Sequence, residues 1–254
     1  MEKVGMQYHV SAEEKRVSSG IDGLDGLLQG GYPKGSVILI AGTPGTGKTI
    51  ACFQYINQGL KQGEKCLFLT SDQRIDNLLR QAKKFGFDFE TPMSQGLMTF
   101  KYLDLEKHAV HREMEQEIQA GKYSRVVLDS LTPLSEVPVW ITSRGNEIIP
   151  SEDSMSNTAY PVDSVQATRM HVRRLLSILE EDDCTALVTS EISEGSRDLS
   201  RDSISEFLVD GILILDLDST MDRRKIMIRK MRETKHTLKP RDIEINSQGG
   251  IKIQ

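Results

Sequence analysis

Residues 42–49, GTPGTGKT, constrain the fold of this chain more than any other segment. They match the pattern G-x-x-x-x-G-K-[ST] at every fixed position, and they stand between the apolar run SVILIAG and a helical pattern over about residues 47–61. A strand, a glycine-rich loop and a helix in this order form a phosphate cradle, because loop N–H groups and the helix N-terminus point at phosphate oxygens. The motif therefore predicts an α/β fold whose nucleotide-binding loop, here called the P-loop, follows a buried strand.

The residue types of the P-loop suit a nucleoside triphosphate with Mg²⁺. Glycines let the backbone wrap closely around phosphates, Lys48 is placed to meet the β- and γ-phosphates, and the Thr49 hydroxyl is placed to bind Mg²⁺. A glycine-rich turn without a ligand is the alternative, which the strand–loop–helix context disfavours. We therefore expect ATP and Mg²⁺ as ligands, with these predicted binding residues: Gly42, Thr43, Pro44, Gly45, Thr46, Gly47, Lys48 and Thr49.

A P-loop needs a second acidic residue to hold the metal, and the stretch RVVLDS supplies one. Asp129 ends a short hydrophobic run that is typical of a buried strand. An aspartate in this place is often only a loop residue, but a P-loop upstream favours the metal-binding role. Ser130 beside it is a candidate to help hold the metal or its waters.

The stretch CLFLTSDQR presents a third acidic position. Its apolar part, residues 66–70, predicts a buried strand, and the strand ends abruptly in polar residues that include Asp72 and Gln73. In open α/β sheets ligands bind at the carboxyl ends of the strands. In this position the chain resembles P-loop ATPases of the RecA type, which carry an acidic residue there. That resemblance implies that Asp72 orients and deprotonates the water that attacks the γ-phosphate, as the catalytic base.

The remaining pattern predicts one α/β domain over residues 17–254, preceded by a flexible arm at residues 1–16. Strands alternate with helices as far as about residue 191, and three strands finish the chain. This order predicts a mostly parallel central sheet flanked by helices, with antiparallel strands at the C-terminal edge. A short helix is expected at residues 21–28, with Ser19 as its cap. Residues 132–163 lack a sustained period and are interpreted as a long irregular excursion.

Composition excludes several classes of protein. The chain has 254 residues and three widely spaced cysteines, so neither a disulfide framework nor a zinc site is indicated. It contains no apolar run long enough to cross a bilayer and no signal-peptide pattern, so we expect a cytoplasmic protein without a membrane association. The formal net charge of −5 argues against a protein held on nucleic acid mainly by phosphate contacts.

Five stretches together carry a family resemblance. They are SSGIDGLDGLLQGGYPKGSVILIAGTPGTGKT, VVLDSL, LVTSEI, VDGILILDLD and RKMRETKH. On these stretches the chain resembles the KaiC-like branch of the RecA/RadA ATPase superfamily over about residues 17–253. The last stretch is the most specific, since few other P-loop families carry it near the end of the chain.

The resemblance implies a ring-shaped homo-oligomer, a hexamer, with ATP bound between subunits. Lys230, Arg232 and His236 would then reach the γ-phosphate bound to the neighbouring subunit, as arginine fingers do in other ATPases. Ser190 and Glu191, at the end of the expected sensor strand, would report on the γ-phosphate. On a strand, Lys230 and Arg232 would share a face, which permits a joint role.

The chain departs from the family where two consecutive glutamates are usual, because it has Asp72 and Gln73 there. Gln73 can hydrogen-bond a water but cannot accept its proton, so we expect slow hydrolysis, with Asp72, Lys48 and Gln73 as the catalytic set. The excursion after Asp129, with Trp140 in it, is also longer than the family pattern. The chain has one ATPase module, so the phosphorylation chemistry of two-module clock proteins is not carried over to it.

Three functions stay open at this point. The first is a slow Mg²⁺-dependent ATPase, and the second is an ATP-dependent assembly switch that engages a protein partner with little hydrolysis. The third is a DNA-repair accessory that binds single-stranded DNA through the loops at Trp140 and at Arg197 and Arg201. His108 and His111 have a spacing that permits a metal, although a charged surface helix explains them equally well.

Overall fold

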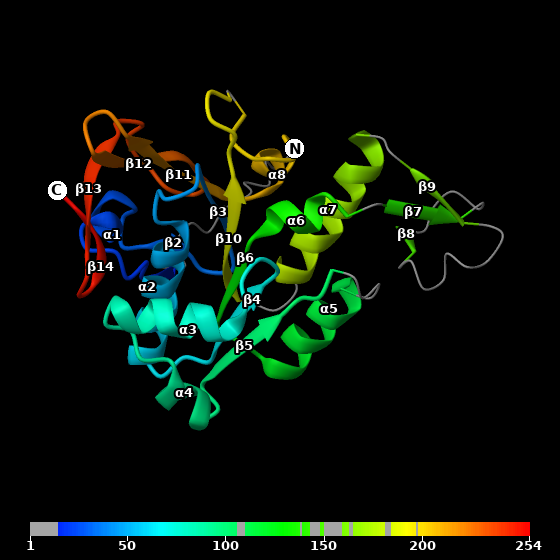
Figure 1. Cartoon of the computed structure of the whole chain (residues 1–254), viewed down its shortest axis with the longest axis horizontal. Coiled ribbons are helices and arrows are strands. Elements are labelled where there is room, and N and C mark those ends of the chain that lie inside the picture. The colour runs from blue at the N-terminus through cyan, green and yellow to red at the C-terminus, as the bar shows by residue number, and fades with distance from the viewer. Residues whose placement is uncertain are drawn as a thin grey trace, which may run out of the picture.

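The computed structural model describes residues 15–105, 110–137, 139–142, 148–149, 159–162, 165–180, 184–196 and 198–254. Within this part of the chain, nine strands form a central sheet in the order β14-β13-β12-β11-β3-β10-β6-β4-β5 (Figure 1). Neighbours from β11 to β5 run parallel, and β12, β13 and β14 join antiparallel at the other edge. The predicted fold, a mostly parallel sheet with antiparallel C-terminal strands, is confirmed.

The strands of the central sheet follow the apolar runs of the sequence. Their bounds are β3 Val37–Gly42, β4 Cys66–Thr70, β5 Met98–Tyr102, β6 Arg125–Asp129, β10 Thr185–Glu191, β11 Gly211–Asp218, β12 Arg223–Met231, β13 Arg241–Asn246 and β14 Gly250–Ile253. Two smaller sheets join β1 Arg16–Val17 to β2 Tyr32–Pro33, and β7 Val139–Thr142 to β8 Ile148–Ile149 and β9 Ala159–Val162.

Helices cover both faces of the central sheet, and each face has its own hydrophobic core. The first core includes side chains of α1, α2 and α3, and the second includes side chains of α5, α6 and α7. The helices of the described residues are α1 Leu24–Leu27, α2 Lys48–Lys61, α3 Ile75–Lys84, α4 Glu90–Ser94, α5 Val110–Gly121, α6 Leu131–Ser135, α7 Val165–Glu180 and α8 Ser205–Leu208.

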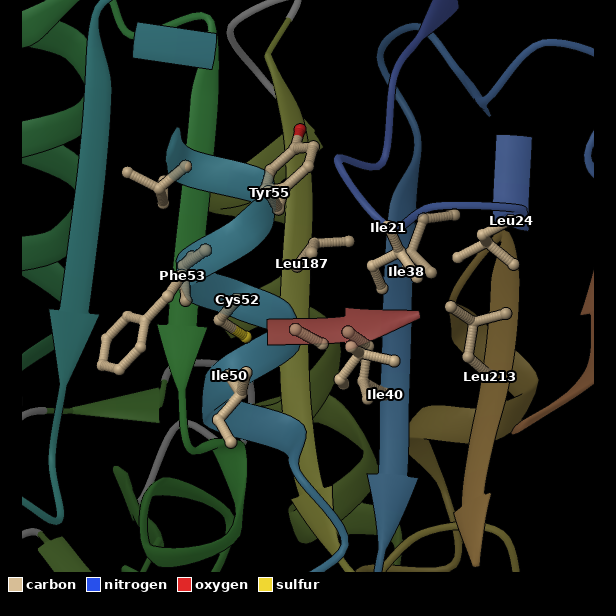
Figure 2. Close-up of a cluster of buried hydrophobic side chains, with 14 of the residues drawn as sticks. Ile21, Leu24, Ile38, Ile40, Ile50, Cys52, Phe53, Tyr55, Leu187 and Leu213 are labelled. Atoms are coloured by element: carbon tan, nitrogen blue, oxygen red, sulfur yellow. The ribbon is translucent and has the colours of Figure 1, made fainter. Parts of the chain in front are cut away.

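Strand β3 shows how the sequence specifies this layering. Every residue of β3 is buried, as expected for a parallel strand between two helical layers. Because side chains alternate along a strand, Ile38 and Ile40 enter the first core, whereas Leu39 enters the second. Figure 2 shows Ile38 and Ile40 facing helix α2, whose Phe53 and neighbouring side chains complete the first core. The P-loop is thus anchored at both ends in buried structure.

The structure corrects three expectations. Ser19 does not cap α1, because Gly23 holds the N-cap position and the Ser19 hydroxyl instead accepts a bond from the Ile21 N–H. Arg16, assigned above to the arm, pairs in β1, while residues 1–14 lie outside the description. The excursion is not wholly irregular: helix α6 and the sheet of β7, β8 and β9, which includes the Trp140 backbone, occupy its described parts.

No helix in the described ranges is long and apolar enough to span a membrane.

Candidate nucleotide-binding site

The P-loop joins the carboxyl end of β3 to the first turn of α2, as the motif predicts. Gly45 and Gly47 have φ of 82° and 104°, in the left-handed region that favours glycine. At Gly42 a Cβ atom would lie 2.4 Å from the Leu215 carbonyl oxygen of the neighbouring strand β11. The three glycines are therefore required by backbone conformation and by close packing.

A cleft of about 290 Å³ opens beside the P-loop, at the carboxyl ends of the strands. Its volume falls at the lower end of the range for small-molecule sites. It brings together segments far apart in the sequence, namely the P-loop, the ends of β4, β6 and β10, and helix α3. The cleft is lined by Pro44, Gly45, Gly47, Lys48, Thr49, Ile50, Asp72, Gln73, Gln81, Asp129, Ser130 and Glu191.

The two predicted metal-binding residues are in direct contact. The Thr49 hydroxyl donates to Asp129 Oδ2 at 2.8 Å, and the Thr189 hydroxyl donates to Asp129 Oδ1 at 2.5 Å. Burial raises the pKa of Asp129, and the bonds from Thr189 and Thr49 and the charge of Lys48 oppose that rise. A hydroxyl and a carboxylate at this separation are hard oxygen donors, the kind that Mg²⁺ prefers. The residues present therefore fit a magnesium ion.

Lys48 occupies the inner side of the P-loop. Its Nζ donates to the carbonyl oxygens of Gly42 and Thr43, at 2.8 and 3.1 Å. Burial lowers the pKa of Lys48, and the carboxylates of Glu191 and Asp129 oppose this effect. The ammonium group thus lies in the cleft among acidic side chains, where a triphosphate would also place negative charge.

Asp72 lies two residues beyond the end of β4 and lines the same cleft as the P-loop residues. Its side chain is exposed to solvent, and its Oδ2 accepts a 2.8 Å hydrogen bond from the Ser130 hydroxyl. Partial burial of the carboxyl raises the pKa of Asp72, which the Ser130 bond opposes. Gln73 is also exposed and lines the same cleft. Asp72 and Gln73 therefore line the same cleft as Thr49 and Asp129.

Besides the three predicted fingers, four predicted binding residues lie outside this cleft. Gly42 and Thr43 line a separate cavity of about 200 Å³, and the buried Thr46 hydroxyl donates to the Thr43 carbonyl. Ser190 is buried, and its hydroxyl accepts from the Arg201 backbone N–H, whereas its neighbour Glu191 is exposed and lines the cleft. Of the two predicted sensor residues, Glu191 alone lines the cleft.

Two of the predicted fingers, Lys230 and Arg232, lie near the amino end of β3, whereas the P-loop follows its carboxyl end. Arg232, just beyond β12, forms a 2.8 Å ion pair with Asp210, whose other carboxylate oxygen accepts from the N–H of Val37 at the start of β3. Strand β3 spans roughly 17 Å from Val37 to the P-loop. Lys230 Nζ donates to the carbonyl of Val209, next to Asp210. Neither cation lines the cleft of its own chain.

His236, the third predicted finger, follows the same strand. Its Nδ1 lies 3.0 Å from the Thr234 carbonyl oxygen. The Thr234 hydroxyl in turn accepts a 2.6 Å bond from Arg16 of β1. His236 is thus part of a segment tied to the N-terminal strand, and it does not line the cleft.

Three residues near the site were not identified from the sequence. Thr189 bonds Asp129, Thr132 accepts from the Glu191 backbone N–H, and Gln81 of α3 lines the cleft. Thr189 carried a signal, because it is a polar residue in a buried strand. Recognising its partner required the sheet order, which places β10 beside β6.

The other weak features of the sequence receive little support. The Arg201 side chain donates hydrogen bonds to Glu136 and Ser193. Arg197 and His108 lie outside the described residues. His111 packs edge-on against His171 with ring centroids 4.7 Å apart. Over the described ranges, no group of three or more His, Cys, Asp or Glu side chains forms a candidate metal site.

Comparison with known proteins places the chain in a family. The sequence model for the KaiC ATPase family matches residues 17–140 and 149–254. UPF0273 protein MK0039 of Methanopyrus kandleri is 30% identical over 238 residues, covering 92% of this chain and 90% of that protein. UPF0273 protein PAE3143 of Pyrobaculum aerophilum is 33% identical over 243 residues, covering 94% of this chain and 82% of that protein.

A solved structure agrees with the sequence comparison. The crystal structure of the KaiC-like protein PH0186 from Pyrococcus horikoshii superimposes with a TM-score of 0.76 at 30% identity. The alignment covers 94% of this chain and 99% of that one. With the P-loop, the acidic strand ends and the sheet order described above, these matches show that the chain belongs to the KaiC family of ATPases.

Proposed function

We propose that the protein is a slow, Mg²⁺-dependent ATPase that works as a ring-shaped homo-oligomer, a hexamer, with ATP bound between subunits. The contact between Thr49 and Asp129, with Lys48 beside it, is the observation that carries the proposal. A hydroxyl, a buried carboxylate and an ammonium gathered at a P-loop suit a metal-bound triphosphate.

Each side chain has a separate task in this proposal. The P-loop amides and Lys48 hold the phosphates, and Thr49 and Asp129 hold Mg²⁺. When bound, Mg²⁺ would neutralise charge on the phosphate oxygens. Asp72 orients the attacking water and accepts its proton, and Gln73 hydrogen-bonds the water without accepting a proton. Glu191 senses the occupied cleft from the end of β10, with Ser190 beside it tied to the loop at Arg201.

The shared site is supported by where the predicted fingers lie. Lys230 and Arg232 are held at the amino end of β3, whereas the P-loop is at its carboxyl end. A cation that acts on the γ-phosphate must lie within hydrogen-bond distance of it. These cations would therefore act on the nucleotide of a neighbouring subunit, in a head-to-tail ring.

A second candidate is an ATP-dependent assembly switch that engages a protein partner with little hydrolysis. Gln73 favours it, because the cleft has an amide where the family usually has a second glutamate. DNA binding has weaker support, since Arg201 pairs with Glu136 and the net charge is −5. That function would require measurable affinity for single-stranded DNA, and the affinity should fall steeply as the salt concentration rises.

Phosphate release separates the enzyme from the switch. We expect wild type to release phosphate in steady state with Mg²⁺, and Asp129→Asn to lower the rate by at least about 100-fold, because losing a metal ligand removes several kcal/mol of charge stabilisation. ATP binding is measured in parallel with a fluorescent analogue, and EDTA gives the metal-free baseline. A wild type that binds ATP but releases no more phosphate than Asp129→Asn would refute the ATPase and favour the switch.

A further inference from the structure

We propose that Ser130 is a positioning residue for catalysis, which holds the Asp72 carboxylate in the orientation that accepts the proton of the attacking water. The inference rests on the proposed ATPase function and deepens it. Ser130 was considered above as a helper of the metal, but its hydroxyl donates to Asp72 instead.

The bond to Asp72 is one of three hydrogen bonds that connect the end of β4 to the end of β6. The Ser71 N–H donates to the Asp129 carbonyl at 3.3 Å, and the Ser71 hydroxyl donates to the Ser130 carbonyl at 3.0 Å. The Ser130 hydroxyl then donates to Asp72 Oδ2 at 2.8 Å. Ser71 and Ser130 are buried, with 7% and 2% of their surface exposed, so both hydroxyls form these hydrogen bonds in the protein interior.

Asp72 needs such a partner because it stands on an exposed turn. Its side chain is exposed, and an aspartate on a turn at the protein surface can adopt several rotamers. A buried hydroxyl that donates to one carboxylate oxygen selects one of them. The carboxylate has about four lone-pair positions, so the bond leaves acceptor capacity for a water.

The same hydrogen bonds also connect Asp72 to the residue that contacts Thr49. Asp129, which contacts Thr49 through its side chain, and Ser130, which contacts Asp72, are adjacent in the chain. The distance between the metal-binding carboxylate and the base is therefore set by one dipeptide at the end of β6. A misplacement of about 1 Å in a catalytic group can cost about 100-fold in rate, so this arrangement has a kinetic consequence.

The test removes the hydroxyl and measures binding and turnover separately. For Ser130→Ala we expect kcat to fall about 10- to 100-fold, because a hydrogen bond to a charged group is lost, while ATP affinity stays unchanged. Ser130→Thr keeps a hydroxyl and is expected to retain most of the turnover. Ser135→Ala is the matched control, since Ser135 is also buried but bonds the Thr132 carbonyl within α6.

A double-mutant cycle distinguishes positioning from a general structural role. If Ser130 acts through Asp72, adding Ser130→Ala to Asp72→Asn lowers the residual single-turnover rate no further. An additional loss in that background, or turnover of Ser130→Ala equal to wild type, overturns the inference while leaving the ATPase intact. If wild type itself releases no phosphate above Asp129→Asn, both proposals fall. Should Ser130→Ala not fold, Ser130→Thr with low turnover and normal ATP binding would contradict the role of the hydroxyl.

Discussion

Asp72→Asn lowers phosphate release by about 100- to 10,000-fold, the usual contribution of general acid–base catalysis, and leaves ATP binding intact. The asparagine has nearly the same shape, and its amide oxygen can still accept the bond from Ser130. It cannot accept a proton from the attacking water, however. The rate is measured in single turnover, so that product release does not mask the chemical step.

Two further variants make this result specific. Asp76→Asn, which changes an exposed aspartate of α3, is the control and should turn over like wild type. Gln73→Glu should raise turnover, because it restores a second carboxylate beside Asp72. If Asp72→Asn and Gln73→Glu both turn over like wild type, the pair is structural and the base lies elsewhere.

Arg125 is a buried charged residue, and we expect its replacement to cause the largest loss of folding stability among the variants considered. Its side chain is fully buried and stacks on the Tyr55 ring. It donates to the carbonyls of Ser18 and Tyr55, at 2.7 and 3.0 Å, to Gln62 at 2.9 Å, and to the Glu64 carboxylate. This arginine therefore ties β6 to both the N-terminal segment and the end of α2.

Arg125→Ala should lower the free energy of unfolding by about 3–5 kcal/mol, because it removes a large buried side chain and leaves buried carbonyl acceptors unpaired. The substitution leaves Glu64 and three acceptors without their donor and opens a cavity beside Tyr55. Chemical denaturation without nucleotide, at one protein concentration, measures the change.

The control for this prediction is Arg112→Ala, which removes an exposed arginine from α5. A surface substitution of this kind should change stability by less than about 0.5 kcal/mol. A loss below about 1 kcal/mol for Arg125→Ala would contradict the account, since that is the size expected for an exposed pair.

The sequence predicted the elements that carry a local signal. The P-loop has fixed spacing, and the apolar runs before Asp72 and Asp129 mark buried strands, so the order of the central strands and the longer helices followed from pattern alone. Both aspartates then reach one cleft because parallel strands present their carboxyl ends at the same edge. The positions of Asp72 and Asp129 depend only on this rule, so they can be predicted from the sequence.

What the sequence did not predict depends on long-range packing. The partner of Thr189 follows from the register of β10 against β6. The bond from Ser130 to Asp72 follows from the backbone path just after β6 and β4, where Ser130 is the N-cap residue of helix α6. Arg125 reads as an ordinary charged residue at a strand start, although the fold buries it completely. The β-sheet of β7, β8 and β9 was missed because its strands have no more than four residues each.

A mixing experiment tests the central claim, that each ATP site is completed by a neighbouring subunit. Lys48→Ala removes the lysine that we propose binds the phosphates, and Arg232→Ala removes a predicted finger. Each variant alone should be inactive. Mixed in equal amounts without nucleotide and then given ATP, a head-to-tail ring pairs an intact P-loop with an intact finger at roughly a quarter of its sites.

The account predicts that the mixture regains phosphate release, to roughly a quarter of the wild-type rate per chain, since only mixed interfaces are complete. Sedimentation with ATP verifies that the mixture assembles, and Arg112→Ala mixed with Lys48→Ala serves as the control with no finger removed. A mixture that assembles but releases no more phosphate than the two variants alone, or an Arg232→Ala chain as active as wild type, would contradict the shared site.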